Sequence, residues 1–113
     1  MDGMRNAWLD FLPWRRWRVV ATVEAADQIP AELPLHGAVV VGTIGKPKWV
    51  AFDCPCGRKH RIMVSLDPRH RPHWRLIPSP NLTLLPSIDA VNQGRRCHYF
   101  MRNGRAEWVR GRG

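Results

Sequence analysis

Apolar and polar positions alternate along much of the chain, which predicts short β-strands. The clearest case is residues 61–66, where Ile62, Val64 and Leu66 alternate with residues of the opposite face, the pattern of a half-buried strand. Further runs rich in β-branched and aromatic residues are 18–24, 38–44, 48–52, 73–77 and 82–85. Proline and glycine separate these runs. We therefore expect a mainly β fold, a single small domain of about seven short antiparallel strands.

The end of the chain carries a hairpin signal. Asn103-Gly104 stands between two β-rich runs, and this pair suits a type I′ turn because both residues tolerate positive φ. The turn would pair Arg102 with Arg105, and the strands would then alternate with a period of two. One face of the hairpin would hold Cys97, Tyr99, Met101, Ala106 and Trp108.

Helix is predicted only in two short turns. Trp8, Phe11 and Leu12 have helical spacing near the start of the chain. Ser87 could cap a single helical turn over residues 88–91.

The length of 113 residues supports one domain. We expect a basic, Trp-rich leader over residues 1–18, a β-domain over residues 19–109 and a disordered basic tail over residues 110–113. No apolar run is longer than residues 38–41, which fall far short of the roughly 20 residues that cross a membrane. The start of the chain also has no apolar signal core. We therefore expect a cytoplasmic protein with no transmembrane segment.

A strong positive charge restricts the choice of partners. Eighteen Lys+Arg against nine Asp+Glu give a net charge of +9, which favours nucleic acid, an anionic membrane or an acidic protein surface. The candidate binding residues are basic or aromatic and lie in the leader and in one loop: Arg15, Arg16, Arg18, Arg69, Arg71, Trp74 and Arg75. Arginine and tryptophan in one loop can bind phosphates and stack on bases. The simpler interpretation packs the Trp rings on the domain and leaves the Arg heads in solvent.

Three cysteines are an odd number, which favours a metal site in a reducing compartment over a set of disulfides. Cys54 and Cys56 can face one ion if the chain turns sharply between them, and Gly57 permits positive φ just after the turn. Cys97 would bring a third sulfur from a distant strand. Thiolate and imidazole are the usual ligands of tetrahedral zinc, so we expect zinc bound by these cysteines. Buried free thiols and a redox pair are the alternatives.

Two histidines compete for the fourth ligand position. His60 follows Cys56 by four residues, and His98 adjoins Cys97. Adjacent side chains in a strand point to opposite faces, which favours His60, whereas a bulge would favour His98. A catalytic metal is less favoured, because Asp53 is the acid next to these residues and the chain has no His-x-Glu tripeptide.

Five blocks of the sequence together resemble one family. They are residues 27–33 (DQIPAEL), 49–62 (WVAFDCPCGRKHRI), 74–76 (WRL), 82–88 (LTLLPSI) and 97–108 (CHYFMRNGRAEW). In this order and spacing they resemble an uncharacterised bacterial Cys/His domain family of unknown function. Its genes often lie beside genes for ubiquitin-like conjugation, namely E1-like, E2-like and JAB-type components. The resemblance implies an accessory role in such a system.

The chain departs from the family pattern at two places. Arg58 and Lys59 stand where the family commonly has a further Cys and Gly. Cys97 directly precedes His98, where the family tends to have a Cys-x-Ser-His run. The resemblance therefore does not supply a complete ligand set, and His60 or His98 would complete it.

These features predict a non-catalytic β-domain with structural zinc, acting as an accessory binding module in a bacterial ubiquitin-like conjugation or defence system. We expect its partner to be a protein and assign no residue a catalytic role. A basic nucleic-acid-binding zinc domain is one alternative, and a small metal-dependent enzyme is another. The oligomeric state stays open.

Overall fold

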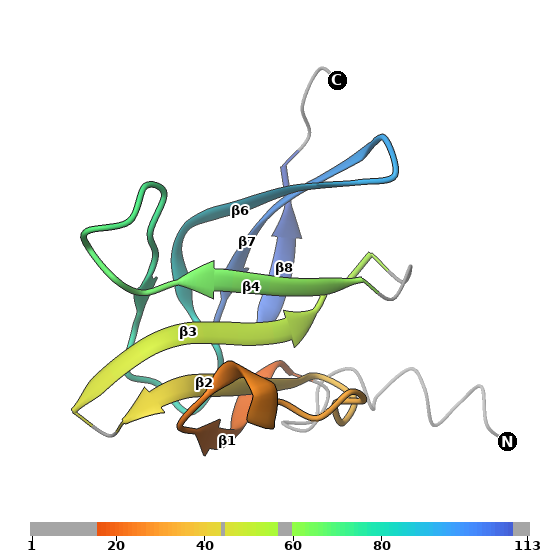
Figure 1. The fold of residues 1–113 in the computed structure, drawn as a ribbon. Coiled ribbons are helices and arrows are strands. Elements are labelled where there is room, and N and C mark those ends of the chain that lie inside the picture. Colours follow the sequence, from red (N-terminus) through yellow and green to blue (C-terminus); the bar gives the residue numbers. More distant parts are fainter. Residues whose placement is uncertain (1–15, 44, 57–59, 110–113) are drawn as a thin grey trace, which may run out of the picture.

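A computed structural model describes residues 16–43, 45–56 and 60–109. The expected leader helix, Arg15 and the tail lie outside these residues. The described chain forms eight strands and one 3₁₀ turn, Ala26–Gln28 (Figure 1). The strands are β1 (Arg18–Val23), β2 (Gly37–Thr43), β3 (Lys46–Asp53), β4 (Arg61–Ser65), β5 (Arg75–Leu76), β6 (Leu84–Asn92), β7 (Arg95–Arg102) and β8 (Arg105–Trp108). None of the described helical segments is long and apolar enough to cross a membrane.

The strands form two sheets of four, in the orders β1-β2-β3-β4 and β5-β6-β7-β8. All neighbouring pairs are antiparallel except β1 and β2, which run parallel. A parallel pair needs a connection that returns to the start of the sheet, and the segment with the 3₁₀ turn supplies it. The expected mainly β fold is thus confirmed, although the first strand pair is not antiparallel.

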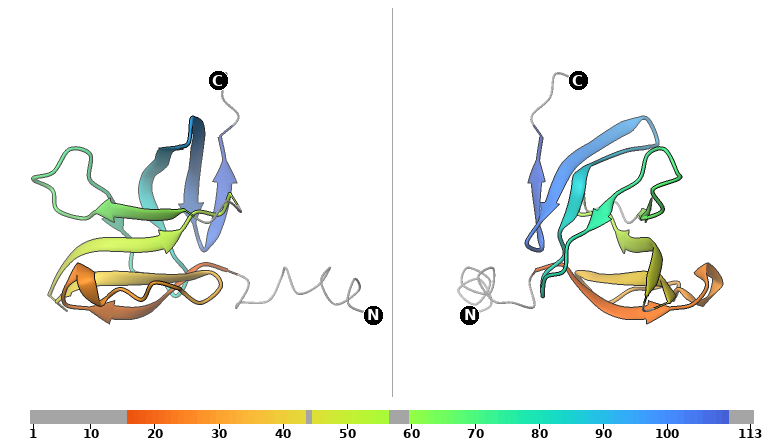
Figure 2. Two further views of the ribbon diagram at one scale, coloured as in Figure 1. Left: turned by 45° about the vertical axis from the view of Figure 1, so that its right-hand side comes forward. Right: turned by 90° about the vertical axis from the view of Figure 1, so that its left-hand side faces the viewer.

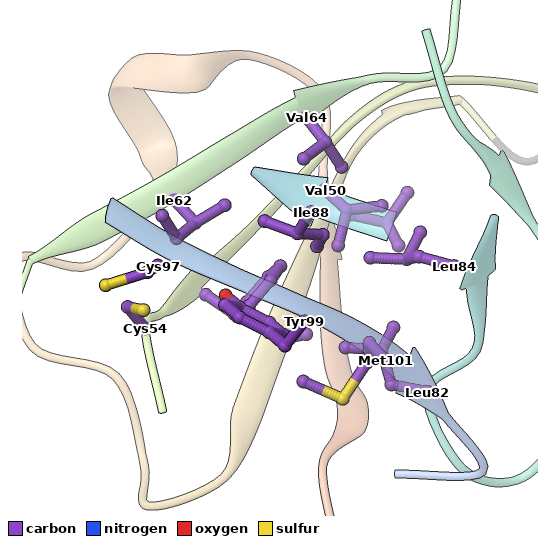
Figure 3. Packing of buried hydrophobic residues seen from close by; sticks show 13 residues of the cluster. Val50, Cys54, Ile62, Val64, Leu82, Leu84, Ile88, Cys97, Tyr99 and Met101 are labelled. Carbon is purple, nitrogen blue, oxygen red and sulfur yellow. The ribbon is translucent and has the colours of Figure 1, made fainter. Parts of the chain in front are cut away.

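The core lies between the two sheets, which Figure 2 shows from two further sides. Its largest fully buried side chains include Phe52 of β3 and Tyr99 of β7, and Figure 3 shows Tyr99 at the centre of the cluster. Strand β2 is buried on both faces, with Val39 and Val40 at 1% and 6% exposure. Its continuous apolar run reflects this two-sided burial.

The predicted C-terminal hairpin is confirmed residue by residue. Arg102 pairs with Arg105, and φ is 50° at Asn103 and 76° at Gly104. The period of two places Tyr99 opposite Trp108, and their ring centroids lie 4.9 Å apart.

The predicted helical turn over residues 88–91 is wrong, because these residues belong to β6. Ile88 pairs with Tyr99 of β7 and is 2% exposed, so burial against the neighbouring strand overrides the local capping signal. The register between β6 and β7 shifts between Leu84 and Ile88. Ser87 lies within this irregular stretch.

Candidate metal centre and candidate active site

One end of the core gathers four potential metal ligands. The ligand atoms of Cys54, Cys56, His60 and Cys97 all lie within 4.8 Å of one another. His60 Nε2 lies 3.2 Å from Cys56 Sγ and 3.8 Å from Cys97 Sγ. Figure 3 shows the Cys54 and Cys97 side chains side by side at the edge of the buried cluster. These four residues could hold a metal ion.

The spacing fits a tetrahedral zinc ion. With Zn–S near 2.3 Å and Zn–N near 2.0 Å, neighbouring ligand atoms of a tetrahedron lie about 3.5 to 3.8 Å apart. The distances from His60 Nε2 to the sulfurs of Cys56 and Cys97 bracket this range. Three sulfurs and one imidazole also make a common zinc donor set. The residues present therefore fit the ion.

A short loop after β3 brings three of these ligands together. The amide of Cys54 donates a hydrogen bond to the carbonyl of His60 at 2.9 Å, which closes the loop. The amide of Cys56 hydrogen-bonds to the Cys54 sulfur and lowers the pKa of that thiol. At the base of the loop, Arg61 Nε lies 2.9 Å from the Asp53 carboxylate. The Asp53 carboxylate is thus already paired with an arginine.

Burial dominates the chemistry of Cys54. Burial raises the pKa of its thiol to about 12, and the hydrogen bonds that lower it offset only part of this effect. A bound cation would stabilise the thiolate in this apolar setting, which is how metal binding displaces thiol protons. Within the described residues, the buried Tyr99 hydroxyl makes no hydrogen bond of ordinary geometry. Its interaction with the Cys54 sulfur nevertheless lowers the pKa of the thiol.

His98 lies on the other face of β7. Its neighbour Cys97 is buried in the core, whereas His98 is half-buried and pairs with Asp89 of β6 in the ladder. Its Nε2 lies 2.9 Å from the hydroxyl oxygen of Ser87. The structure therefore groups His60 with the cysteines and places His98 beside a serine.

The surroundings of Ser87 and His98 add a carboxylate. Arg96 makes two hydrogen bonds to Asp89, at 2.8 and 2.6 Å. These bonds lower the pKa of Asp89, and the nearby charge of His98 lowers it further. Asp89 is thus held ionised next to the imidazole. A serine, an imidazole at hydrogen-bond distance and a nearby carboxylate are the elements of nucleophilic acyl transfer.

A second Ser–His pair lies at the end of β4, and its geometry is different. Ser65 Oγ lies 2.6 Å from His70 Nδ1 and also accepts the amide hydrogen of Asp67 at 3.2 Å. Ser65 is only 5% exposed. A buried hydroxyl that already holds the following turn is poorly placed to attack a substrate. Ser87, which is partly exposed, is the better candidate nucleophile.

The predicted partner-binding residues fall in two places. Arg69, Trp74 and Arg75 line one pocket, and Arg71 lies exposed in the same loop. Arg16 instead contacts the carbonyl of Asn103 in the β7–β8 turn, at 3.4 Å, and Arg18 begins β1. Trp74 packs against the core and donates its Nε1 hydrogen to the carbonyl of Ser87 at 3.1 Å.

Sequence reasoning missed the Ser87–His98 pair. The signal that could have revealed it is Gln93-Gly94, a second turn with positive φ of 52° and 79°. A hairpin centred there pairs Asp89 with His98. Ser87 then falls diagonally across from His98 on neighbouring strands.

Comparison with known protein families gives a match. The model of a family described as BubE, bacterial ubiquitination-like system serine protease, matches residues 25–109. No curated protein and no solved structure gives a significant match. The matched residues include both the Cys/His group and the Ser87–His98 pair. Since the match covers most of the chain, the protein belongs to the BubE family of bacterial ubiquitination-like systems.

Proposed function

We propose that this protein is a serine hydrolase of a bacterial ubiquitination-like system, with Ser87 as nucleophile and His98 as base. The observation that carries the proposal is the 2.9 Å contact between Ser87 Oγ and His98 Nε2 on a partly exposed sheet face. The family description, which names a serine protease, supports the same chemistry. Because of this description, we propose an enzyme in place of the non-catalytic binding module that the sequence favoured.

The proposed reaction transfers an acyl group to Ser87 and then to water. As Ser87 Oγ attacks the carbonyl carbon of a peptide or isopeptide bond, His98 Nε2 takes the hydroxyl proton. The same imidazole then gives this proton to the departing amine, which leaves an ester on Ser87. Water next attacks the ester, again through His98, and restores the serine. The Asp89 carboxylate stabilises the positive charge on the imidazole in both steps.

We further propose that the Cys/His group holds structural zinc, in a cytoplasmic and therefore reducing compartment. Four protein ligands leave no open position for substrate, as in structural rather than catalytic zinc sites. Cys54, Cys56 and His60 come from the loop after β3, and Cys97 comes from β7. The ion would therefore tie the two sheets together, and its role would be to hold β7 in place.

Labelling with a fluorophosphonate tests the serine chemistry. The probe forms an Oγ–phosphorus bond and releases fluoride, so a mass shift on the Ser87 peptide is expected. Ser87→Ala should abolish labelling and lower hydrolysis of a peptide ester by roughly 1,000-fold. The matched control is Ser65→Ala, which removes the other His-bonded serine. Labelling on Ser65, or unchanged hydrolysis by Ser87→Ala, would refute the assignment.

Metal analysis tests the zinc site. Purified protein should carry one zinc per chain, and a chelator should lower its melting temperature. Cys97→Ser and His60→Asn should lose the metal. His73→Asn is the control, because His73 is a partly exposed imidazole outside the group. Full zinc content in His60→Asn together with loss in His98→Asn would show that the other histidine is the ligand.

A further inference from the structure

A pocket of about 490 Å³ opens between the start of β3 and the loop that follows β4. In Figure 1 this region lies at the left, at the opposite end of β3 and β4 from the Cys/His group. The lining carries four cationic side chains, which are Lys46, Lys48, Arg69 and Arg75. It contains one carboxylate, Asp67, which Arg69 binds at 2.8 Å. The pocket is therefore strongly positive.

Most of this charge is not neutralised by the protein itself. Within the described residues, Lys46, Lys48 and Arg75 take part in no ion pair. All three are exposed at the pocket. Several unpaired cations around one concave site favour the binding of an anionic ligand and raise its association rate.

Trp74 connects the pocket to the candidate active site. Trp74 is one of the residues that line the pocket, and it donates its Nε1 hydrogen to the carbonyl of Ser87 at 3.1 Å. A ligand in the pocket would therefore be separated from the backbone of Ser87, the proposed nucleophile, by the Trp74 side chain. This position suits a part of the substrate near the bond that is cut.

We propose that this pocket binds an acidic segment of the protein substrate, and this inference rests on the proposed function. Glutamate or aspartate side chains flanking the scissile bond would pair with Lys46, Lys48 and Arg75. A protein ligand fits better than nucleic acid. The cations surround one pocket of the size that takes small ligands or a few side chains. Trp74 is half-buried and packed on the core, and its Nε1 hydrogen is bonded to the Ser87 carbonyl, so its ring is less open to a stacked base than an exposed aromatic side chain.

Fluorescence polarisation with synthetic peptides tests the binding step. The probes are a Glu-containing peptide and the same peptide with every Glu replaced by Gln. They are measured on the Ser87→Ala protein, so that binding does not depend on catalysis. The Glu peptide should bind at least tenfold tighter, and Arg75→Glu in the same background should abolish this difference. The control is Arg95→Glu, which makes the same charge reversal in the first residue of β7, outside the pocket.

Three outcomes would overturn the inference. These are equal binding of the two peptides, equal losses in the two charge-reversal variants, or tighter binding of a single-stranded oligonucleotide that Arg75→Glu also weakens. The last would identify the pocket as a nucleic-acid site.

Kinetics on paired Glu and Gln peptide esters test the link to the substrate. The Glu ester should have the lower KM in the unmodified protein. Equal KM values for the two esters would refute the substrate assignment. Failure of fluorophosphonate labelling alongside selective binding of the Glu peptide would count against Ser87 chemistry alone, so the two failures can be distinguished.

Discussion

The amide of Trp17 donates a hydrogen bond to the carbonyl of Gly104 at 2.9 Å, joining two segments from opposite ends of the described chain. Leu82 completes the contact, because its amide bonds to the carbonyl of Trp17 and its carbonyl accepts the amide of Gly104. A Cβ atom on Gly104 would lie 2.7 Å from the Trp17 carbonyl oxygen. The turn thus needs glycine for close approach as well as for its φ of 76°.

Gly104→Ala should therefore destabilise the protein strongly. The matched control is Gly94→Ala, because Gly94 has a φ of 79° and open space around its Cβ position. Gly94→Ala should cost about 1 kcal/mol from backbone strain alone. Gly104→Ala should cost about 1 to 3 kcal/mol more, since the added methyl group also collides with the Trp17 backbone. Urea denaturation of both variants measures the difference, and equal losses would contradict the steric role.

Tyr99→Phe should weaken zinc binding while leaving the metal-free fold nearly unchanged. The buried hydroxyl interacts with the Cys54 sulfur, and a thiolate bound to zinc would accept its hydrogen bond. Removing such an outer partner typically lowers metal affinity about 10-fold or more. Competition with a chromogenic zinc chelator measures the affinity. The melting temperature of the metal-free variant is the control, and unchanged affinity would contradict a role for the hydroxyl.

Asp89→Asn should slow hydrolysis of the peptide ester more than Arg96→Gln does. The Asp89 carboxylate stabilises the positive charge that His98 gains as it takes the serine proton, and the asparagine has no such charge. Arg96→Gln keeps the Asp89 carboxylate and removes only the guanidinium that holds it. Values of kcat for the two variants measure the difference, and equal losses would indicate a merely structural effect.

Asp67→Asn should flatten the loss of stability in acid. The Arg69 guanidinium and amide hold the pKa of Asp67 well below its ordinary value. A carboxyl group whose pKa is lower in the folded than in the unfolded chain stabilises the fold above about pH 4. This stabilisation is lost as the pH falls through the folded-state pKa. Melting temperatures between about pH 2 and 5 should fall less steeply in the variant than in the unmodified protein.

The control for this effect is Asp27→Asn. Within the described part of the chain, Asp27 makes no ion pair. The acid dependence of this variant should match that of the unmodified protein. Equal slopes for Asp67→Asn and the unmodified protein would contradict the prediction.

The parts of the fold that follow from local sequence were predictable. Asn103-Gly104 has only a few compatible turn conformations, so the hairpin and its register follow from two residues and the alternation around them. The region of Ser87 was not predictable in this way. Its serine followed by an apolar run has the pattern of a helix cap, and only pairing with β7 makes it a strand.

The candidate site, too, could be predicted from the sequence only in part. The three cysteines could be grouped from residue type, because cysteine sulfurs at such spacing suit one ion. The sequence left both His60 and His98 open as the fourth ligand, since a bulge at the start of the strand would favour His98. The regular ladder at Cys97 and His98 sends their side chains to opposite faces. The nearness of Ser87 to His98 follows from the pairing of Asp89 with His98 across the Gln93-Gly94 turn, which the expected helical turn over residues 88–91 excluded.

Cys97 and His98 are joined by a single peptide unit, yet one side chain points into the core and the other toward solvent. A shift of the Cys97 backbone would also move His98, because the side chains on the two faces of a strand share one backbone. Oxidation of the inward sulfur would therefore disturb the outward imidazole without any reagent reaching it. The proposed hydrolysis would then be lost although Ser87, which is partly exposed, stays chemically intact.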